Sequence, residues 1–202
     1  MLPQTILNAA RRFGDRAAFR LASGASVSYS DLDRASDEVA AGLAVRGLGE
    51  GDVLLLSLPS GPEYAVAYLA AAKVGAVTAG ANPRLRARER GLVADTVDPA
   101  LVLATESLAG GLPDDLAVEL VTPTEDPGRM LGTLRVAHHN VPDLAEDPGR
   151  AVCICFTSGS TGDPRGAWFT NRQLAAIAEM NFGGAWDPVD SWWRERRPHT
   201  SA

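Results

Sequence analysis

The sequence predicts an α/β fold with a doubly wound, mostly parallel sheet flanked by helices. Two observations lead to this prediction. Short, continuously apolar runs, of which Val53–Leu58 and Leu101–Ala104 are the clearest, alternate with longer segments of helical periodicity. Continuous apolar runs indicate strands covered on both faces, and strands separated by helices at this spacing are joined by right-handed crossovers. Sheets of this kind bind their ligands outside the carboxyl ends of the strands.

The N-terminal part predicts a helix, a small hairpin and a second helix. Thr5–Phe13 has apolar residues near helical spacing. Ala17–Leu21 and Ser26–Tyr29 are typical of two short strands joined by a Ser-Gly turn. We expect the next helix to begin after Ser30, because Ser30 and Asp33 have the spacing of a capping box.

The middle of the chain carries the predicted parallel sheet. Each apolar run is followed by a breaker and then by a helical pattern. In order, the elements are a strand at Val53–Leu58, a helix at Glu63–Val74, a strand at Val77–Ala79, a helix at Arg86–Val97 and a strand at Leu101–Ala104.

The segment Glu106–Arg150 is rich in Pro, Gly and Asp and is interpreted as a variable connection with one strand at Ala117–Val121. His138-His139 within it is expected to be an exposed turn rather than a metal site, since no carboxylate or Cys ligand repeats nearby at a helical spacing. Further on, Ala167–Phe169 predicts a short strand. Thr170-Asn171-Arg172-Gln173 then has the form of a capping box and opens a helix that runs to Phe182.

Length and composition are those of one soluble globular domain, with 202 residues of which 46% are hydrophobic and 22% charged. No apolar run is long enough to span a bilayer, and the N-terminus lacks the pattern of a signal peptide, so we expect a cytoplasmic location. A net charge of −6 with scattered arginines excludes a basic surface for nucleic acid.

Three residues of rare type limit the chemistry. Cys153 and Cys155 are the only cysteines, and we expect both to be buried, reduced thiols on one face of a strand, because a disulfide would distort the strand and two ligands do not make a zinc site. Lys73 is the only lysine, and its place near a helix C-terminus favours a structural role.

The segment with the clearest chemistry follows the apolar run at Val152–Phe156. Residues 157–166 read Thr-Ser-Gly-Ser-Thr-Gly-Asp-Pro-Arg-Gly. Glycines allow several backbone N–H groups to point at one anion, hydroxyls add donors, and Arg165 supplies a planar cation suited to phosphate. The alternative is a flexible Gly/Ser linker. The position directly after a buried strand favours the phosphate site, whereas the spacing fits neither the P-loop nor the Rossmann pattern.

Residues 157–166 resemble the signature Thr-Ser-Gly-Ser/Thr-Thr-Gly-x-Pro-Lys-Gly of the adenylate-forming superfamily, which includes acyl-CoA synthetases, luciferases and the adenylation domains of peptide synthetases. They match at every position but one, since Arg165 stands where Lys is usual. Asn171 stands where many members place His. Further similarity to the acyl-CoA synthetase branch lies in Gly47–Val53, Leu69–Val77, Asn82-Pro83 and Arg88-Glu89.

The resemblance implies an ATP-dependent, AMP-forming ligase that joins a fatty or other carboxylic acid to coenzyme A, with Mg²⁺ beside ATP. It implies a partial N-terminal AMP-binding domain at 1–182, an incomplete part of an acyl-CoA synthetase-like fold, followed by a disordered tail at 183–202 and no C-terminal domain. It identifies no catalytic residue and no protein ligand for a metal. The implied ATP-binding residues are Thr157, Ser158, Gly159, Ser160, Thr161, Gly162, Arg165 and Gly166.

Later landmarks of that superfamily do not follow Gly166 in this sequence. We therefore expect the 202-residue chain to bind triphosphate only weakly and to turn over almost no substrate by itself. The alternative is a non-catalytic remnant or interaction module, in which an exposed apolar sheet face binds a partner or a second copy.

Overall fold

The computed structural model describes residues 1–137, 141, 143–157 and 164–182. Within them lies a six-stranded sheet with the order β6-β5-β3-β4-β7-β8, in which β8 is antiparallel to β7 and all other neighbours are parallel. The predicted doubly wound, mostly parallel α/β fold is therefore confirmed. The strands are β3 (Val53–Ser57), β4 (Val77–Gly80), β5 (Leu101–Ala104), β6 (Val118–Leu120), β7 (Ala151–Thr157) and β8 (Arg165–Thr170).

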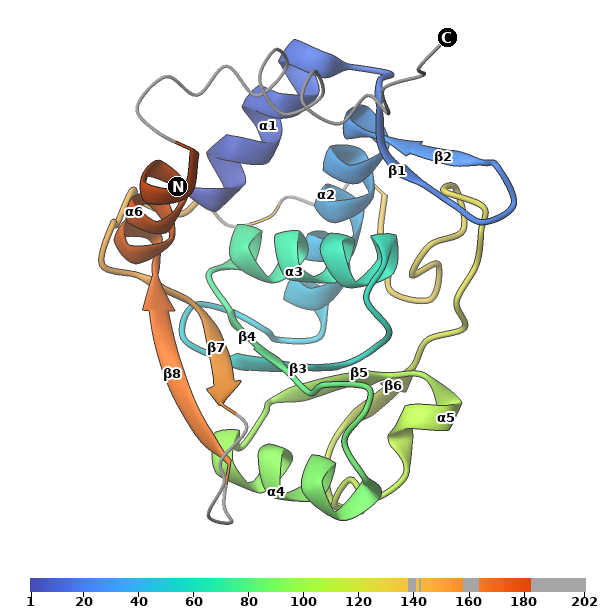
Figure 1. The fold of residues 1–202 in the computed structure, drawn as a ribbon, viewed down its shortest axis with the longest axis vertical. Coiled ribbons are helices and arrows are strands. Elements are labelled where there is room, and N and C mark those ends of the chain that lie inside the picture. Colours follow the sequence, from blue (N-terminus) through green and yellow to red (C-terminus); the bar gives the residue numbers. More distant parts are fainter. Residues whose placement is uncertain (138–140, 142, 158–163, 183–202) are drawn as a thin grey trace, which may run out of the picture.

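Helices cover both faces of this sheet (Figure 1). One face packs against three helices in a large apolar core, and the opposite face packs against α4. A short antiparallel hairpin of β1 and β2 lies outside the sheet. These elements are α1 (Leu2–Phe13), α2 (Tyr29–Val45), α3 (Pro62–Val74), α4 (Ala87–Val97), α5 (Glu106–Ala109), α6 (Asn171–Phe182), β1 (Ala17–Arg20) and β2 (Ser26–Ser28).

Strand β3 shows why the apolar runs are continuous. Its side chains alternate between faces, so Leu54 and Leu56 enter the core under α2 and α3, whereas Leu55 enters the core that also contains Val93 and Ala94 of α4. Every residue of β3 is buried. A central parallel strand with two covered faces leaves no position at which a polar side chain reaches water.

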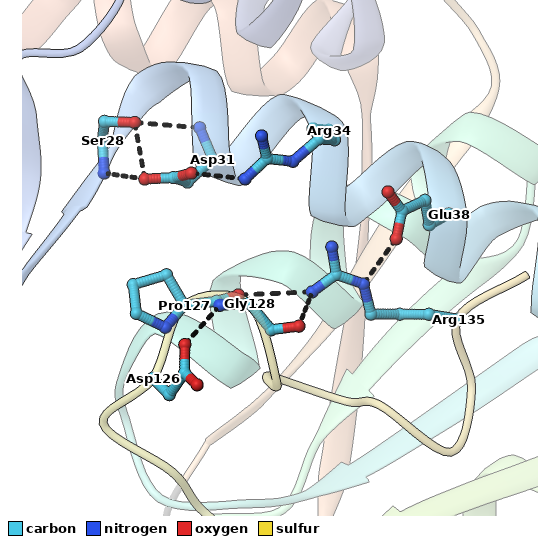
Figure 2. Close-up of polar contacts among 8 residues, drawn as sticks. All are labelled: Ser28, Asp31, Arg34, Glu38, Asp126, Pro127, Gly128 and Arg135. Carbon is cyan, nitrogen blue, oxygen red and sulfur yellow. Dashed lines mark hydrogen bonds and ion pairs between the residues drawn. The ribbon is translucent and has the colours of Figure 1, made fainter. Parts of the chain in front are cut away.

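Helix α2 begins two residues earlier than predicted, and its cap is Ser28 rather than Ser30. The backbone N–H of Asp31 donates to Ser28 Oγ at 3.0 Å, and the backbone N–H of Ser28 donates to Asp31 Oδ2 at 3.1 Å, which is the reciprocal capping box (Figure 2). Burial raises the pKa of Asp31, but hydrogen bonds from Ser28 and the charge of Arg34 outweigh it, so the net pKa lies below the usual value.

The segment expected to be a variable connection is in part a packed element of the core. Met130, Leu131 and Leu134 are buried against α2 and its neighbours. Arg135 fixes this segment to α2, because its Nε donates to Glu38 Oε2 at 2.6 Å and its Nη1 donates to the Gly128 carbonyl at 2.8 Å (Figure 2). These buried apolar side chains lie in irregular backbone, and the sequence did not predict their burial.

Candidate phosphate-binding site

The predicted phosphate segment is flanked by a pair of antiparallel strand ends. Strand β7 ends at Thr157 and β8 begins at Arg165, and these two residues are directly paired in the sheet. Arg165 and Gly166, which the sequence assigned to the loop, are therefore strand residues. Thr157 and Arg165 close the base of a hairpin, whereas Ser158, Gly159, Ser160, Thr161 and Gly162 lie outside the described residues.

This hairpin base lies at the carboxyl edge of the parallel sheet. Strand β7 runs parallel to β4, with Thr78 beside Cys153 and Ala79 beside Ile154, so Thr157 stands at the same edge as the end of β4. The chain leaves β3 for α3 on one face and leaves β4 for α4 on the other. The connections thus diverge between β3 and β4, the point at which doubly wound sheets bind ligands, one strand away from β7.

Gly166 is required by the packing of this hairpin. A Cβ atom at Gly166 would lie 2.6 Å from Cγ2 of Ile154 and 3.2 Å from the ring of Phe156. Real Cβ atoms do not approach neighbours so closely, so any larger residue would push β8 away from β7. The glycine therefore fixes the strand spacing next to Arg165.

Two tyrosines of α3 cover the α3 side of β4 and β7. A Cβ atom at Gly80 would lie 2.5 Å from the Tyr64 hydroxyl, which therefore occupies the space over this glycine. Burial, together with the nearby thiols of Cys155 and Cys153, raises the pKa of Tyr64. Neither Tyr64 nor Gly80 stood out in the sequence, because a tyrosine in an apolar helix indicates only packing.

The two cysteines differ in exposure, which corrects one prediction. Cys153 is buried as expected, but Cys155 is exposed. The hydroxyl of Tyr68 covers Cys153, whose pKa is raised mainly by burial. Cys155 lies two residues nearer the carboxyl end of β7. It is paired with Ala167 of β8, which is itself exposed.

Lys73 connects two helices, α3 and α2. Its Nζ donates to Asp33 Oδ1 at 2.8 Å, to the Asp33 carbonyl at 3.1 Å and to Asp37 Oδ1 at 2.5 Å. Its side chain is only 9% exposed. These contacts support the structural role expected for the only lysine of the chain.

Asn171 also has a structural position. Its Oδ1 accepts the backbone N–H of Leu2 at 3.2 Å, and its Nδ2 donates to the Asp147 carbonyl at 3.4 Å. The predicted capping box of this helix is present next to it, because the backbone N–H of Thr170 donates to Gln173 Oε1 at 2.8 Å. Asn171 therefore connects α6 to α1 at the end of β8 remote from Arg165.

Two cavities help to delimit the site. A cavity of about 260 Å³ opens at the carboxyl ends of β3, β5 and β6 between Leu58, Gly61 and Thr124. A cavity of about 450 Å³ is lined by Ala151 and Val152, at the beginning of β7. Because the phosphate segment follows the other end of β7, the second cavity is not part of the candidate site.

The described residues contain no cluster of three or more His, Cys, Asp or Glu side chains that could hold a metal ion. Among the helices that the structure describes, none is long and apolar enough to cross a membrane. His138 and His139 lie outside the described residues, as does the segment 183–202.

Comparison with known proteins decides the family. The model of the family described as AMP-binding enzyme matches residues 6–194. The chain belongs to this family of AMP-binding enzymes. Similar curated proteins include 4-coumarate–CoA ligase 5 of Oryza sativa subsp. japonica, 33% identical over 168 residues, and 4-coumarate–CoA ligase 3 of the same plant, 34% identical over 169 residues. These alignments cover 79% and 80% of this chain but only 30% of each ligase, so the chain spans less than a third of their length.

Solved structures of other proteins have the same fold. The complex of VinN with 3-methylaspartate superposes with a TM-score of 0.78 at 23% identity, covering 90% of this chain and 50% of that chain. The fatty acyl CoA synthetase of Mycobacterium tuberculosis gives 0.70 at 20% identity, covering 84% and 34%. At these identities the superpositions support the fold alone.

Proposed function

We propose that residues 157–166 bind the β- and γ-phosphates of ATP. The observation that carries the proposal is the pairing of Thr157 with Arg165 at the carboxyl edge of the sheet, on either side of the glycine- and hydroxyl-rich segment. Hydroxyl donors, backbone N–H groups and one guanidinium match the negative charge and the oxygen acceptors of a polyphosphate. The donor set therefore fits the triphosphate of ATP.

In the whole protein, this site would serve the ATP-dependent activation of a carboxylic acid. An acid oxygen attacks the α-phosphorus of ATP, the bond to pyrophosphate breaks, and a thiol, coenzyme A, then displaces AMP from the acyl-adenylate. Membership of the AMP-binding family supports this reaction class. The names of the relatives include coumarate and fatty acyl substrates, so the proposal names the substrate only as a carboxylic acid.

Magnesium accompanies ATP in this proposal and supplies charge neutralisation to the leaving phosphates. No protein ligand is assigned to it, since the described residues offer no suitable cluster. The hydroxyls, backbone N–H groups and guanidinium of residues 157–166 would bind and orient the phosphates.

The test is a titration of the 202-residue chain with MgATP, followed by thermal shift and calorimetry. We expect ATP to raise the melting temperature of the unaltered protein and of Arg165→Lys, and to have a much smaller effect on Arg165→Ala. Arg172→Ala is the matched control, because Arg172 is exposed on α6. Equal ATP responses in Arg165→Ala and the control would refute phosphate binding by this segment.

We further propose that the 202 residues by themselves do not complete the reaction. The alignments with the rice ligases cover only 30% of those enzymes, which supports this part of the proposal. Formation of an acyl-adenylate by the purified chain, given MgATP and a panel of carboxylic acids, would refute it. ATP binding without any such product is the expected result.

A second candidate function is that of an interaction module. Its support is the exposure of three apolar side chains: Trp168 of the edge strand β8 is 53% exposed, and Ile177 and Met180 of α6 are 41% and 86% exposed. Light scattering across a concentration series tests this candidate. A mass that rises with concentration, and returns to that of a monomer in Trp168→Ser, would support self-association, whereas a constant monomer mass would refute it.

A further inference from the structure

Cys153 and Cys155 lie on the same face of β7. They are separated by Ile154, which points into the opposite core with α4. Both are free cysteines, and the hydroxyl of Tyr68 lies beside the sulfur of Cys153. The proposed phosphate site uses neither thiol, so the chemistry of this pair is not explained by it.

The distance between the two cysteines determines whether they can be joined by a disulfide or by a metal ion. Alternate residues of a strand are about 6.6 Å apart, and their Cβ atoms point in the same direction. A disulfide needs Cβ atoms about 3.5–4.5 Å apart, which this spacing does not allow without distortion. A metal ion with two opposed sulfur bonds of about 2.3 Å needs sulfurs about 4.6 Å apart, which two side chains leaning toward each other can provide. The strand therefore favours a metal bridge over a disulfide.

The two thiols differ in their access to solvent. Cys155 is exposed and Cys153 is buried. Strand β4 pairs Thr78 with Cys153 and Ala79 with Ile154, so extending this register by one residue brings Gly80 level with Cys155. The Tyr64 hydroxyl occupies the space over Gly80. An ion can therefore reach Cys155 from solvent and then contact Cys153, while Tyr64 and Tyr68 cover the inner side.

The ligand set excludes most metals. No third His, Cys, Asp or Glu side chain in the described residues joins these thiols in a metal-binding cluster. Zinc in proteins takes four ligands, and hard cations take oxygen. Two thiolates alone suit a soft ion that accepts low coordination, such as Cu(I).

We propose that Cys153 and Cys155 form a binding site for a soft monovalent cation, Cu(I) or Ag(I), held between the two sulfur atoms. Binding replaces two thiol protons with two metal–sulfur bonds and releases both protons, with no change of oxidation state. The site lies two residues before Thr157 and is independent of the proposed ATP binding.

The test uses the full 202-residue chain, reduced and without oxygen, titrated with silver nitrate in a buffer free of thiols and chloride. Native mass spectrometry reports stoichiometry, and a pH indicator reports proton release. We expect one Ag(I) per monomer with two protons released, and affinity lowered by about 100-fold or more in Cys153→Ser and in Cys155→Ser, because the second sulfur binds within the same molecule.

Cys155→Ser is expected to fold even if Cys153→Ser does not, since Cys155 is exposed and its replacement leaves the core intact. Circular dichroism checks that each variant is folded. Unchanged silver affinity in either folded single variant would overturn the proposal. A dimer bridged by one silver ion that is still observed for Cys153→Ser would also overturn the proposal. In that case the ion would be held by Cys155 of two copies of the chain.

Discussion

Gly166 of β8 lies so close to Ile154 of β7 that a single added methyl group would meet Ile154 Cγ2 at 2.6 Å. Ile154 is itself buried and cannot move aside freely. The strand pair that carries Thr157 and Arg165 is therefore held at a spacing that only glycine permits. We therefore expect the hairpin base to be sensitive to substitution at Gly166.

We predict that Gly166→Ala destabilises the protein by about 1–3 kcal/mol, the usual cost of an overpacked contact. Displacement of β8 should also weaken the response to ATP. Thermal unfolding with and without MgATP measures both effects. Gly49→Ala is the control, since a Cβ atom there would meet only Asp52 Oδ2 at 3.9 Å. Equal stability of the two variants would contradict the packing argument.

The cap of α2 allows a direct test between two serines. Ser28→Ala should cost about 1 kcal/mol of unfolding free energy, because the backbone N–H of Asp31 loses its acceptor. Ser30→Ala should change this free energy by less than about 0.5 kcal/mol, as for an ordinary substitution away from a cap. Urea unfolding of both variants measures the difference. A larger loss of unfolding free energy for Ser30→Ala than for Ser28→Ala would show that Ser30 is the cap, as the sequence first indicated.

The same capping box predicts a pH dependence. The pKa of Asp31 is lowered in the folded state from 3.8, so its carboxylate contributes stability above pH 3.8 that is lost as the pH falls through the folded-state pKa. Asp31→Asn should therefore be less stable than the unaltered protein at neutral pH, and the gap should narrow as the solution is acidified below pH 3.8. A gap that stays constant with pH would show that the charge of Asp31 does not contribute.

The central strands of the sheet could be predicted because a short, continuous apolar run is stable only where both faces of the strand are buried. Leu101–Ala104 is observed with the predicted bounds, and β3 ends one residue early, at Ser57. The cap could not be predicted, since Ser28 with Asp31 and Ser30 with Asp33 have the same spacing. The end of the β1–β2 hairpin decides between them, as it holds Ser28 in extended backbone, with φ −82° and ψ 169°.

The candidate site was predictable only in part. Glycines, hydroxyls and a cation directly after an apolar strand favour phosphate binding over a linker, and this stays a prediction, because residues 158–163 lie outside the described part of the chain. The pairing of Arg165 with Thr157 depends on the antiparallel return of β8, which the sequence placed two residues too late, at Ala167. Tyr64 and Gly80 meet only through the packing of α3 on β4, and no local pattern reports that contact.

Lys73→Met should lower the unfolding free energy by about 2 kcal/mol, since it leaves the largely buried Asp33 carboxylate without its cation. Arg34→Met, which breaks an exposed ion pair with Asp31, should cost less than about 1 kcal/mol. Denaturant unfolding compares the two variants. The ATP response should be unchanged in Lys73→Met once it is measured below the lowered melting temperature. Loss of that response in a fully folded variant would instead assign Lys73 to the ligand.

Arg135 holds the segment 122–136 against α2 through its contacts with Glu38, Pro127 and Gly128 (Figure 2). Arg135→Ala removes an ion pair to Glu38 and hydrogen bonds to the carbonyls of Pro127 and Gly128, and its side chain is only 11% exposed. We expect a loss of about 2–3 kcal/mol and faster proteolysis within this segment.

Glu38→Gln should cost less, about 1 kcal/mol, because the carbonyl acceptors of Arg135 remain. In the double variant, Arg135→Ala with Glu38→Gln, the two losses should fall short of their sum, since the residues share one interaction. Limited proteolysis with mass spectrometry locates the cleavage sites. Strict additivity, or cleavage of Arg135→Ala only outside the segment 122–136, would show that the buried Met130 and Leu134 hold the segment without the help of Arg135.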